Sequence, residues 1–292
     1  MTSGPASHSY FSQRLKLHYV EWGNPDAPVL LMIHGMRDHC RNWDWVAREF
    51  CKAYRVIAPD LRGHGDSQWQ IGGSYHVMDF VADINQLVKQ TTKPDQKISI
   101  LCHSFGGSVG LYFSGTYPEK IEKIIAIEGL GLPPQYLQMM KKMKVEERMS
   151  SWMDSIHKLS ARAPKKYESL ESAIERMHQE NSHLSDEQAR HLSIHGLNQN
   201  EDGTYSWKFD NYLRILSPVR PSQKEQDDLW SRVTCPVLLL SGAKSWALAP
   251  NKDERAKLFK HAQYHTFENA GHWLHHDQLD AFLERTKAFL NS

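Results

Sequence analysis

The chain contains few cysteines and lacks both signals for disulfides and signals for membranes. Only four of its 292 residues are cysteines, Cys40, Cys51, Cys102 and Cys235. No two of them form a C-x-x-C pair, which argues against a disulfide framework or a thiolate zinc site. The N-terminal stretch has no basic segment followed by an apolar one, and no window reaches about 18 apolar residues. We therefore expect reduced thiols, a cytoplasmic protein and no stable membrane association.

The chain also lacks an excess of either charge. Lys and Arg number 35 against 34 for Asp and Glu, which gives a formal net charge of +1. Such a balance creates no overall field that favours nucleic acid, an anionic membrane or a strongly acidic substrate. We therefore expect a small-molecule substrate and no nucleic-acid partner. The length fits one large α/β domain or a core with a substantial insertion, as a monomer or homodimer.

Short apolar runs alternate with helical patterns along most of the chain. Unbroken Val, Ile and Leu runs are typical of strands buried on both faces of a parallel sheet, and they occupy residues 29–33, 55–60, 98–102, 121–129 and 236–240. Residues 77–88 and 279–290 instead place their apolar side chains on one face of a helix. This alternation predicts an α/β fold with a doubly wound, mostly parallel sheet.

The alternation fails in residues 132–232, where charge, Met and Trp are dense and the spacing is helical. We predict a helical cap there, inserted between core segments 1–131 and 233–292. Apolar side chains in the cap, among them Trp152, suit an adaptable roof over acyl or aryl groups. The alternative that these side chains only hold the cap helices together remains open.

The segment SILCHSFGGSVG (residues 99–110) carries a candidate nucleophile. A buried strand ends at Cys102 and a helix begins near Gly106, so Ser104 lies on a sharp strand-to-helix turn. A serine in that position projects its hydroxyl from the carboxyl end of the sheet, where the amide of Phe105 can stabilise an oxyanion. Cys102 replaces the first glycine of the G-x-S-x-G pattern. An ordinary helix-capping role for Ser104 is the alternative.

Three further motifs join this segment in a fixed order: HGMRDHCRNWDWV (34–46), DLRGHGDS (60–67) and NAGHWLHHDQ (269–278). Together the four motifs resemble the α/β-hydrolase superfamily, and the resemblance covers nearly the whole chain. It implies that the amide of Met36 is the second oxyanion donor, opposite that of Phe105. It also implies that His34 is a structural loop residue and that no cofactor is required.

His272 is the candidate general base. It follows the last predicted strand, which places it at the same edge of the sheet as Ser104, and imidazole suits proton transfer near neutral pH. The neighbouring His275 and His276 raise the idea of a metal cluster. No H-E-x-x-H pattern or accompanying ligand set is present, so we expect no metal.

The expected position of the catalytic acid holds Ser245 instead of aspartate, and Asp253 lies too far along the loop. Glu128 ends the strand after the nucleophile helix, and parallel strands end at one edge, so its carboxylate can reach His272. The arrangement resembles haloalkane dehalogenases, in which the acid has moved to that strand. The alternative is that Glu128 only caps a loop or pairs with a residue such as Arg148.

These residues predict a carboxylesterase-like serine hydrolase that cleaves an ester or lactone of a small, largely apolar substrate through an acyl-enzyme. Dehalogenase and epoxide-hydrolase chemistry is disfavoured because both use an aspartate nucleophile. Hydrolysis of an amide or a C–C bond, a ligand-binding pseudo-hydrolase or receptor, and an interaction protein stay open as alternatives. The candidates for the substrate pocket are Arg37, His103, Trp152, Trp246 and Trp273. Arg37 could instead pair with Asp38.

Overall fold

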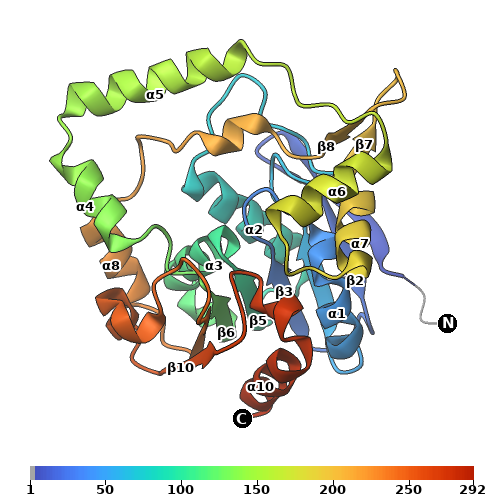
Figure 1. Ribbon diagram of the computed structural model, residues 1–292. Coiled ribbons are helices and arrows are strands. Elements are labelled where there is room, and N and C mark those ends of the chain that lie inside the picture. Colours follow the sequence, from blue (N-terminus) through green and yellow to red (C-terminus); the bar gives the residue numbers. More distant parts are fainter. Residues whose placement is uncertain (1–3) are drawn as a thin grey trace.

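The computed structural model describes residues 4–292 and contains an eight-stranded sheet (Figure 1). The strand order is β1-β2-β4-β3-β5-β6-β9-β10. β2 runs antiparallel to both neighbours, and the remaining pairs are parallel. The strands are β1 (Ala6–Ser12), β2 (Leu15–Trp22), β3 (Val29–Ile33), β4 (Arg55–Pro59), β5 (Ile98–His103), β6 (Ile121–Ile127), β9 (Val237–Gly242) and β10 (Ala262–Phe267). The predicted mostly parallel sheet is confirmed.

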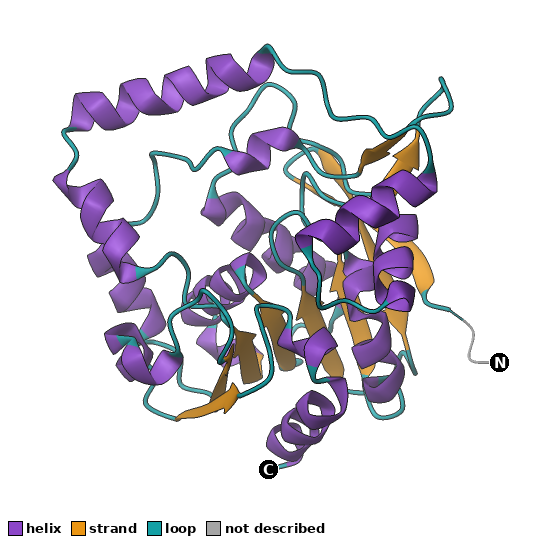
Figure 2. Cartoon of the chain, viewed as in Figure 1, coloured by secondary structure: helices purple, strands orange, loops and turns teal. Residues whose placement is uncertain are grey.

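Helices cover both faces of this sheet, as Figure 2 shows. One apolar cluster joins one set of alternate strand side chains to α2 (Val77–Thr91), α3 (Phe105–Thr116) and α8 (Gln223–Trp230). A second cluster joins the other set to α1 (Asp44–Phe50) and α10 (Leu279–Asn291). Successive strand side chains point to opposite faces, so an unbroken apolar run supplies both clusters. The predicted doubly wound arrangement is confirmed.

The N-terminal hairpin of β1 and β2 was not predicted. β1 is mostly exposed and buries only Tyr10 and Ser12. It therefore lacks the unbroken apolarity of a central strand, because it forms the edge of the sheet. β2, its antiparallel neighbour, contributes the buried residues Leu17 to Val20.

The inserted segment, residues 132–222, lies between β6 and α8. It contains α4 (Pro134–Lys142), α5 (Val145–Ser160), α6 (Leu170–Glu180), α7 (Asp186–Gly196), the hairpin of β7 (Leu197–Gln199) and β8 (Tyr205–Trp207), and η3 (Asn211–Arg214). In Figure 1, α4 to α7 lie on one side of the sheet, in green to yellow. The predicted helical character is present, together with a short hairpin whose side chains are mostly not buried.

Two features of the insertion bear on its predicted bounds and role. α8 packs against α3, and its Trp230 is buried in the core cluster, so residues 223–230 pack with the core although the predicted cap extends to residue 232. Met139 and Met153 are exposed on α4 and α5. The predicted first core segment, 1–131, begins with three residues that lie outside the described residues.

Short elements complete the chain: η1 (Cys40–Trp43), η2 (Pro118–Lys120), η4 (Pro250–Lys252), η5 (Glu254–Leu258) and α9 (Leu274–Asp277). The apolar spacing of residues 77–88 and 279–290 predicts two helices, and both are present as α2 and α10. Within residues 4–292, no helix combines the length and the apolarity needed to span a bilayer.

A backbone contact fixes α3 against the loop that follows β6. A Cβ atom added to Gly107 would lie 2.3 Å from the Cα of Gly129, and one added to Gly129 would lie 2.8 Å from the Cα of Gly107. Only glycine at both positions allows so close an approach. The contact holds residue 128 next to the start of α3, where Ser104 lies.

Six histidines of the described chain are at most 7% exposed. Burial disfavours the charged imidazolium, and it lowers the pKa of His39 to about 4 and the pKa values of His64 and His276 to about 3. Burial also lowers the pKa of the other three, His34, His103 and His275. The folded protein therefore keeps these side chains neutral at neutral pH.

We predict that Gly107→Ala lowers the free energy of unfolding by about 1 to 3 kcal/mol relative to Gly110→Ala, because the new methyl group would meet backbone. Gly110→Ala is a matched control on the same helix, since its Cβ would meet mainly the side chain of Cys102, at 3.0 Å. Urea unfolding of both variants measures the difference. Equal stability of the two variants would contradict the contact.

We also predict that the free energy of unfolding falls as the pH is lowered from about 6.5 to 4. Histidines of the unfolded chain take up protons near pH 6.5, whereas the buried ones stay neutral, so the unfolded state binds more protons. Each group contributes up to about 1.4 kcal/mol per pH unit. Asp38, whose pKa burial raises to about 7, and Asp83, whose pKa burial also raises, act in the opposite sense, as two groups against six histidines. Urea unfolding midpoints that are the same or higher at pH 5 than at about pH 6.5 would contradict this prediction.

Candidate active site

Ser104 connects β5 to α3 in a strained backbone conformation. Its φ of 53° and ψ of −120° lie where residues other than glycine are rarely found. Its amide donates to the carbonyl of Ile127 on β6 at 2.8 Å, and its carbonyl accepts from the amide of Gly107 at 2.9 Å. A Cβ added to Gly106 would lie 2.3 Å from the carbonyl oxygen of His34. The turn is therefore held tightly, with the serine at its apex.

His272 lies in the loop between β10 and α9 and reaches back to Ser104. The distance between its Nε2 and the Oγ of Ser104 is 3.0 Å. Its Nδ1 contacts the carboxylate of Glu128, so the proton sits on Nδ1 and the serine hydroxyl donates to Nε2. The structure thus brings together the three predicted residues. Glu128 and Ser104 lie 144 and 168 positions before His272 in the sequence.

The carboxylate of Glu128 is fully buried and has three donors. Its Oε1 accepts from the amide of Gly242 at 3.0 Å, and its Oε2 accepts from the hydroxyl of Ser245 at 2.7 Å as well as from His272. A buried carboxylate needs such partners to offset its desolvation. Ser245, which stands where the resemblance expects an aspartate, therefore holds the carboxylate of Glu128 through a hydrogen bond. Within residues 4–292, Arg148 does not pair with Glu128.

Two amides with no partner flank the serine. Phe105 is the first residue of α3, so its N–H has no acceptor within the helix. A Cβ added to Gly35 would lie 3.3 Å from the Cβ of Ser104, which places the loop carrying Met36 against the turn. Among the hydrogen bonds of residues 4–292, neither the amide of Met36 nor that of Phe105 acts as a donor. Both groups are available to an oxyanion.

His34 ties this loop to its neighbour. Its Nδ1 bonds to the carbonyl of Gly35 at 2.7 Å, and its Nε2 accepts from the amide of Leu61 at 3.0 Å. Both ring nitrogens are thus occupied, which fits the structural role that the resemblance implies. In the described chain, Arg37 and Asp38 do not pair with each other, and both line the same cavity.

The candidate pocket residues fall into two groups. Trp246 is 69% exposed with its ring centroid 5.0 Å from that of His272, and Trp273 and Arg37 line a cavity. Trp152 is half-buried on α5 and lines neither the cleft beside Glu128 nor the cavity beside the loop of Met36, both of which are described below. His103 is only 1% exposed, so its predicted place in the pocket is wrong.

His103 instead holds the backbone of His272 from the protein interior. Its Nε2–H donates to the backbone carbonyl of His272 at 2.9 Å, and the two ring centroids are 4.6 Å apart. Asp277 holds the same loop by accepting from the amide of Gly271 at 2.7 Å. These two contacts were not predicted, because the position of His103 directly before Ser104 in the sequence suggests the pocket rather than the interior.

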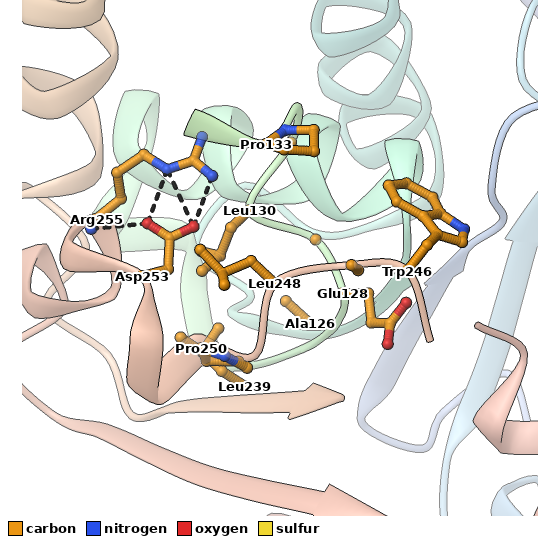
Figure 3. Close-up of a pocket in the computed structure, with 13 residues that line it drawn as sticks. Ala126, Glu128, Leu130, Pro133, Leu239, Trp246, Leu248, Pro250, Asp253 and Arg255 are labelled. Atoms are coloured by element: carbon orange, nitrogen blue, oxygen red, sulfur yellow. Dashed lines mark hydrogen bonds and ion pairs between the residues drawn. The ribbon is translucent and has the colours of Figure 1, made fainter. Parts of the chain in front are cut away.

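A small cleft of about 20 Å³ lies beside Glu128, and Figure 3 shows its lining. Trp246 and Leu248 form part of its wall. At its far side the carboxylate of Asp253 binds the guanidinium of Arg255, with a shortest contact of 2.6 Å. Asp253 is therefore fully engaged away from His272, as its place in the sequence suggested.

A larger cavity of about 270 Å³ lies between the loop after β3 and the inserted segment. Its wall includes Met36 and Trp273, which neighbour the oxyanion loop and the base. Residues of η3 and the β7–β8 hairpin close it from the other side. The cavity therefore lies beside the loop that carries Met36 and beside the residue that follows His272.

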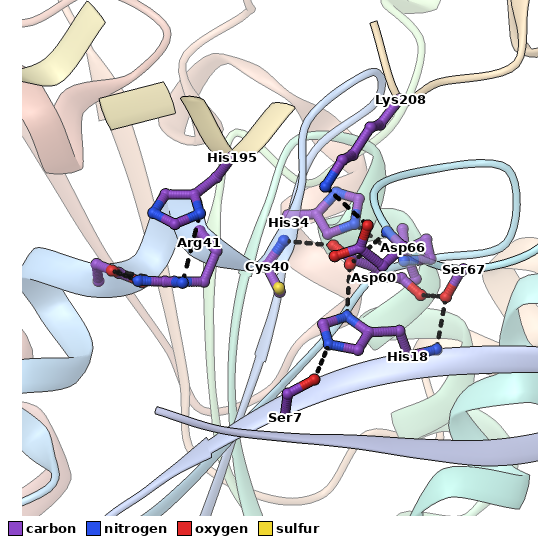
Figure 4. Close-up of polar contacts among 12 residues, drawn as sticks. Ser7, His18, His34, Cys40, Arg41, Asp60, Asp66, Ser67, His195 and Lys208 are labelled. Atoms are coloured by element: carbon purple, nitrogen blue, oxygen red, sulfur yellow. Dashed lines mark hydrogen bonds and ion pairs between the residues drawn. The ribbon is translucent and has the colours of Figure 1, made fainter. Parts of the chain in front are cut away.

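Two groups of side chains have a spacing that could hold a metal ion. His18, Cys40 and Asp60 form the first (Figure 4). The carboxylate of Asp60 accepts from the ring of His18 at 2.7 Å and from the amides of Cys40 and Asp66 at 2.7 and 2.9 Å. The ring of His18 also bonds to Ser7 at 2.8 Å. The group is thus a closed hydrogen-bonded network that fixes the loop after β4.

Asp44, His191 and His195 form the second group, where α1 meets α7. The guanidinium of Arg41 binds the carboxylate of Asp44 through three contacts of 2.7 to 3.1 Å. A cation already neutralises this carboxylate, so a metal ion would have to displace it. We assign no metal to either group.

Comparisons with known proteins agree with this architecture. The model of the alpha/beta hydrolase fold family matches residues 28–279. Epoxide hydrolase 1 of Caenorhabditis elegans is 25% identical over 293 residues, which cover 96% of this chain and 69% of that protein. The sn-1-specific diacylglycerol lipase ABHD11 of Xenopus laevis is 25% identical over 280 residues, covering 92% and 82%.

Among solved structures, a thioesterase domain from the curacin biosynthetic pathway superposes with a TM-score of 0.81. It is 24% identical in sequence, and the match covers 97% of this chain and 99% of that one. At that identity the likeness establishes the fold alone. With the family match over most of its length, the chain belongs to the alpha/beta hydrolase fold family.

Proposed function

We propose that this protein is a serine hydrolase that cleaves a carboxylic ester or lactone through an acyl-enzyme. The observation that carries the proposal is the continuous chain of contacts from Ser104 through His272 to Glu128. In these roles Ser104 is the nucleophile, His272 the general base and Glu128 the acid. We further propose that the inserted segment acts as the cap of this site.

In the proposed reaction, Nε2 of His272 takes the proton of Ser104 while Oγ attacks the carbonyl carbon of the ester. The charge moves to the carbonyl oxygen, which the amides of Met36 and Phe105 stabilise. His272 then protonates the departing alkoxide, and an acyl-enzyme remains. Water that has given its proton to His272 attacks the acyl-enzyme, and the acid and the free serine are released.

Glu128 serves this cycle without changing its own protonation. It holds the Nδ1–H tautomer of His272 and stabilises the imidazolium that forms during attack. The amide of Gly242 and the hydroxyl of Ser245 fix the carboxylate in that position. Ser245 is in this view a positioning residue for the acid.

Two alternatives, a pseudo-hydrolase and an epoxide hydrolase, have less support than ester hydrolysis by Ser104. The pseudo-hydrolase alternative rested on the absence of an aspartate at position 245, whereas the contact of Glu128 with His272 supplies a carboxylate. The relative named an epoxide hydrolase points to a reaction that uses an aspartate nucleophile, whereas the turn here carries Ser104. The relative named a diacylglycerol lipase agrees with ester hydrolysis.

We predict that Ser104→Ala lowers kcat/KM for short-chain 4-nitrophenyl esters by at least about 1,000-fold, because the nucleophile is removed. Release of nitrophenolate measures the rates, and thermal unfolding checks that the variant folds. Ester hydrolysis that persists at the wild-type rate in Ser104→Ala would refute the serine mechanism.

We predict that Glu128→Gln lowers kcat by about 100- to 10,000-fold on the same esters, since the amide cannot hold the correct tautomer or stabilise the imidazolium. Asp253→Asn is the matched control, because Asp253 is another buried carboxylate at the same edge of the sheet. Among residues 4–292, its side chain binds only the guanidinium and the amide of Arg255. We expect this control to stay within about threefold of wild type. A larger loss in Asp253→Asn than in Glu128→Gln would assign the acid elsewhere.

A further inference from the structure

The cavity of about 270 Å³ carries an excess of positive charge that the net charge of the chain conceals. Five basic side chains line it, Arg37, Lys165, Arg176, Lys208 and Arg214, against the two acidic side chains Asp38 and Glu180. These residues come from both the core and the inserted segment. The excess is therefore local to the space beside the oxyanion loop.

Three of the five basic groups are already engaged. Arg176 pairs with Glu180 along α6, and Lys208 pairs with Asp66 at 2.7 Å. The ammonium of Lys165 lies 4.8 Å from the ring centroid of Tyr167. These contacts satisfy part of the positive charge within the protein.

Arg37 and Arg214 remain without a carboxylate. Within residues 4–292, neither takes part in an ion pair. Arg214 has one long contact of 3.4 Å with the amide oxygen of Asn211, and its guanidinium lies 5.6 Å from the ring centroid of Phe209. Partial desolvation and the positive charge of Arg214 lower the pKa of Arg37, while the carboxylate of Glu180 acts in the opposite sense. Arg37 and Arg214 are both exposed, so a ligand in the cavity can reach them.

The acidic residue nearest in sequence does not neutralise Arg37. One carboxyl oxygen of Asp38 accepts from the amide of His39 at 2.8 Å, and the other has no partner among the described residues. Burial raises the pKa of Asp38 to about 7, so much of this group is protonated at neutral pH. Among residues 4–292, the cavity thus keeps two guanidinium groups without an ion-pair partner, and the carboxylate of Glu180 is already paired with Arg176.

Arg37 is also placed by a strained backbone. Its φ of 62° lies in the left-handed region, immediately after Met36 in the oxyanion loop. Such strain in a residue other than glycine points to a functional constraint when the surroundings hold it. Arg37 follows Met36 directly, so one of the two groups attached to the ester carbonyl, the acyl chain or the alkoxy group, lies beside it in the proposed reaction.

We propose that Arg37 and Arg214 form an anion subsite, and that the substrate is an ester whose acyl chain ends in a carboxylate. Guanidinium groups match a carboxylate in planar, charge-assisted hydrogen bonds. The aromatic side chains of Tyr167, Trp207 and Phe209 in the same wall cover the carbon chain between the two ends. The inference rests on the proposed ester hydrolysis and names the substrate class of that site.

The test compares two esters that differ in one group: mono-4-nitrophenyl adipate, which ends in a carboxylate, and 4-nitrophenyl hexanoate, which ends in a methyl group. The readout is the ratio of their kcat/KM values. We expect Arg214→Gln and Arg37→Asn each to lower this ratio by about 10- to 100-fold, the range of a lost charge-assisted hydrogen bond. Asparagine is chosen at position 37 because it tolerates a positive φ.

Arg220→Gln is the matched control, since Arg220 is an exposed arginine of the inserted segment outside the cavity wall. We expect it to leave the ratio within about twofold of wild type. A ratio that is unchanged in Arg214→Gln and Arg37→Asn, or one that falls equally in Arg220→Gln, overturns the subsite.

Binding of adipate and hexanoate to the Ser104→Ala protein, measured by calorimetry, separates this inference from the hydrolytic one. We expect adipate to bind at least about tenfold more tightly than hexanoate, and Arg214→Gln to abolish the difference. If the wild type hydrolyses neither ester while this preference persists, the proposed function fails and the subsite stands. Equal binding of the two acids overturns the subsite even where ester hydrolysis is found.

Discussion

The contact between the carboxylate of Glu128 and His272 is the interaction on which the arrangement of the site depends. A carboxylate that is fully buried costs several kcal/mol unless donors surround it. Gly242 and Ser245 supply two of these donors, and the third is the imidazole itself. The same three contacts also bring β6, the loop after β9 and the loop after β10 to one point. Satisfying the charge and aligning the imidazole with Ser104 are therefore one structural requirement.

The parallel sheet makes this convergence possible. β5, β6, β9 and β10 lie side by side, so residues that follow them meet at one edge although they are far apart in sequence. The contact of Gly107 on α3 with Gly129 after β6 fixes the distance between this helix and the end of that strand. Moving the acid from β9 to β6 is a shift between neighbouring strands, and Ser245 keeps a hydrogen bond where the carboxylate would otherwise be.

Much of the core followed from the sequence because burial on both faces leaves an unbroken apolar signature, as in residues 29–33 and 98–102. The placement of Glu128 beside His272 followed from the rule that parallel strands end at one edge. The β1–β2 hairpin was missed because β1 is an edge strand with few buried side chains. His103 was misplaced because its orientation depends on packing under His272. The charge of the cavity was missed because it arises only when core and inserted residues come together.

The most direct test of the account is the proton on Nδ1 of His272, observed by proton NMR of the protein in water. A hydrogen bond from Nδ1 to a buried carboxylate shifts that proton far downfield and protects it from exchange with solvent. The account predicts such a resonance in the wild type and in Asp253→Asn, and its loss in Glu128→Gln. A downfield resonance that survives in Glu128→Gln would show that another group holds His272 and would contradict the central claim.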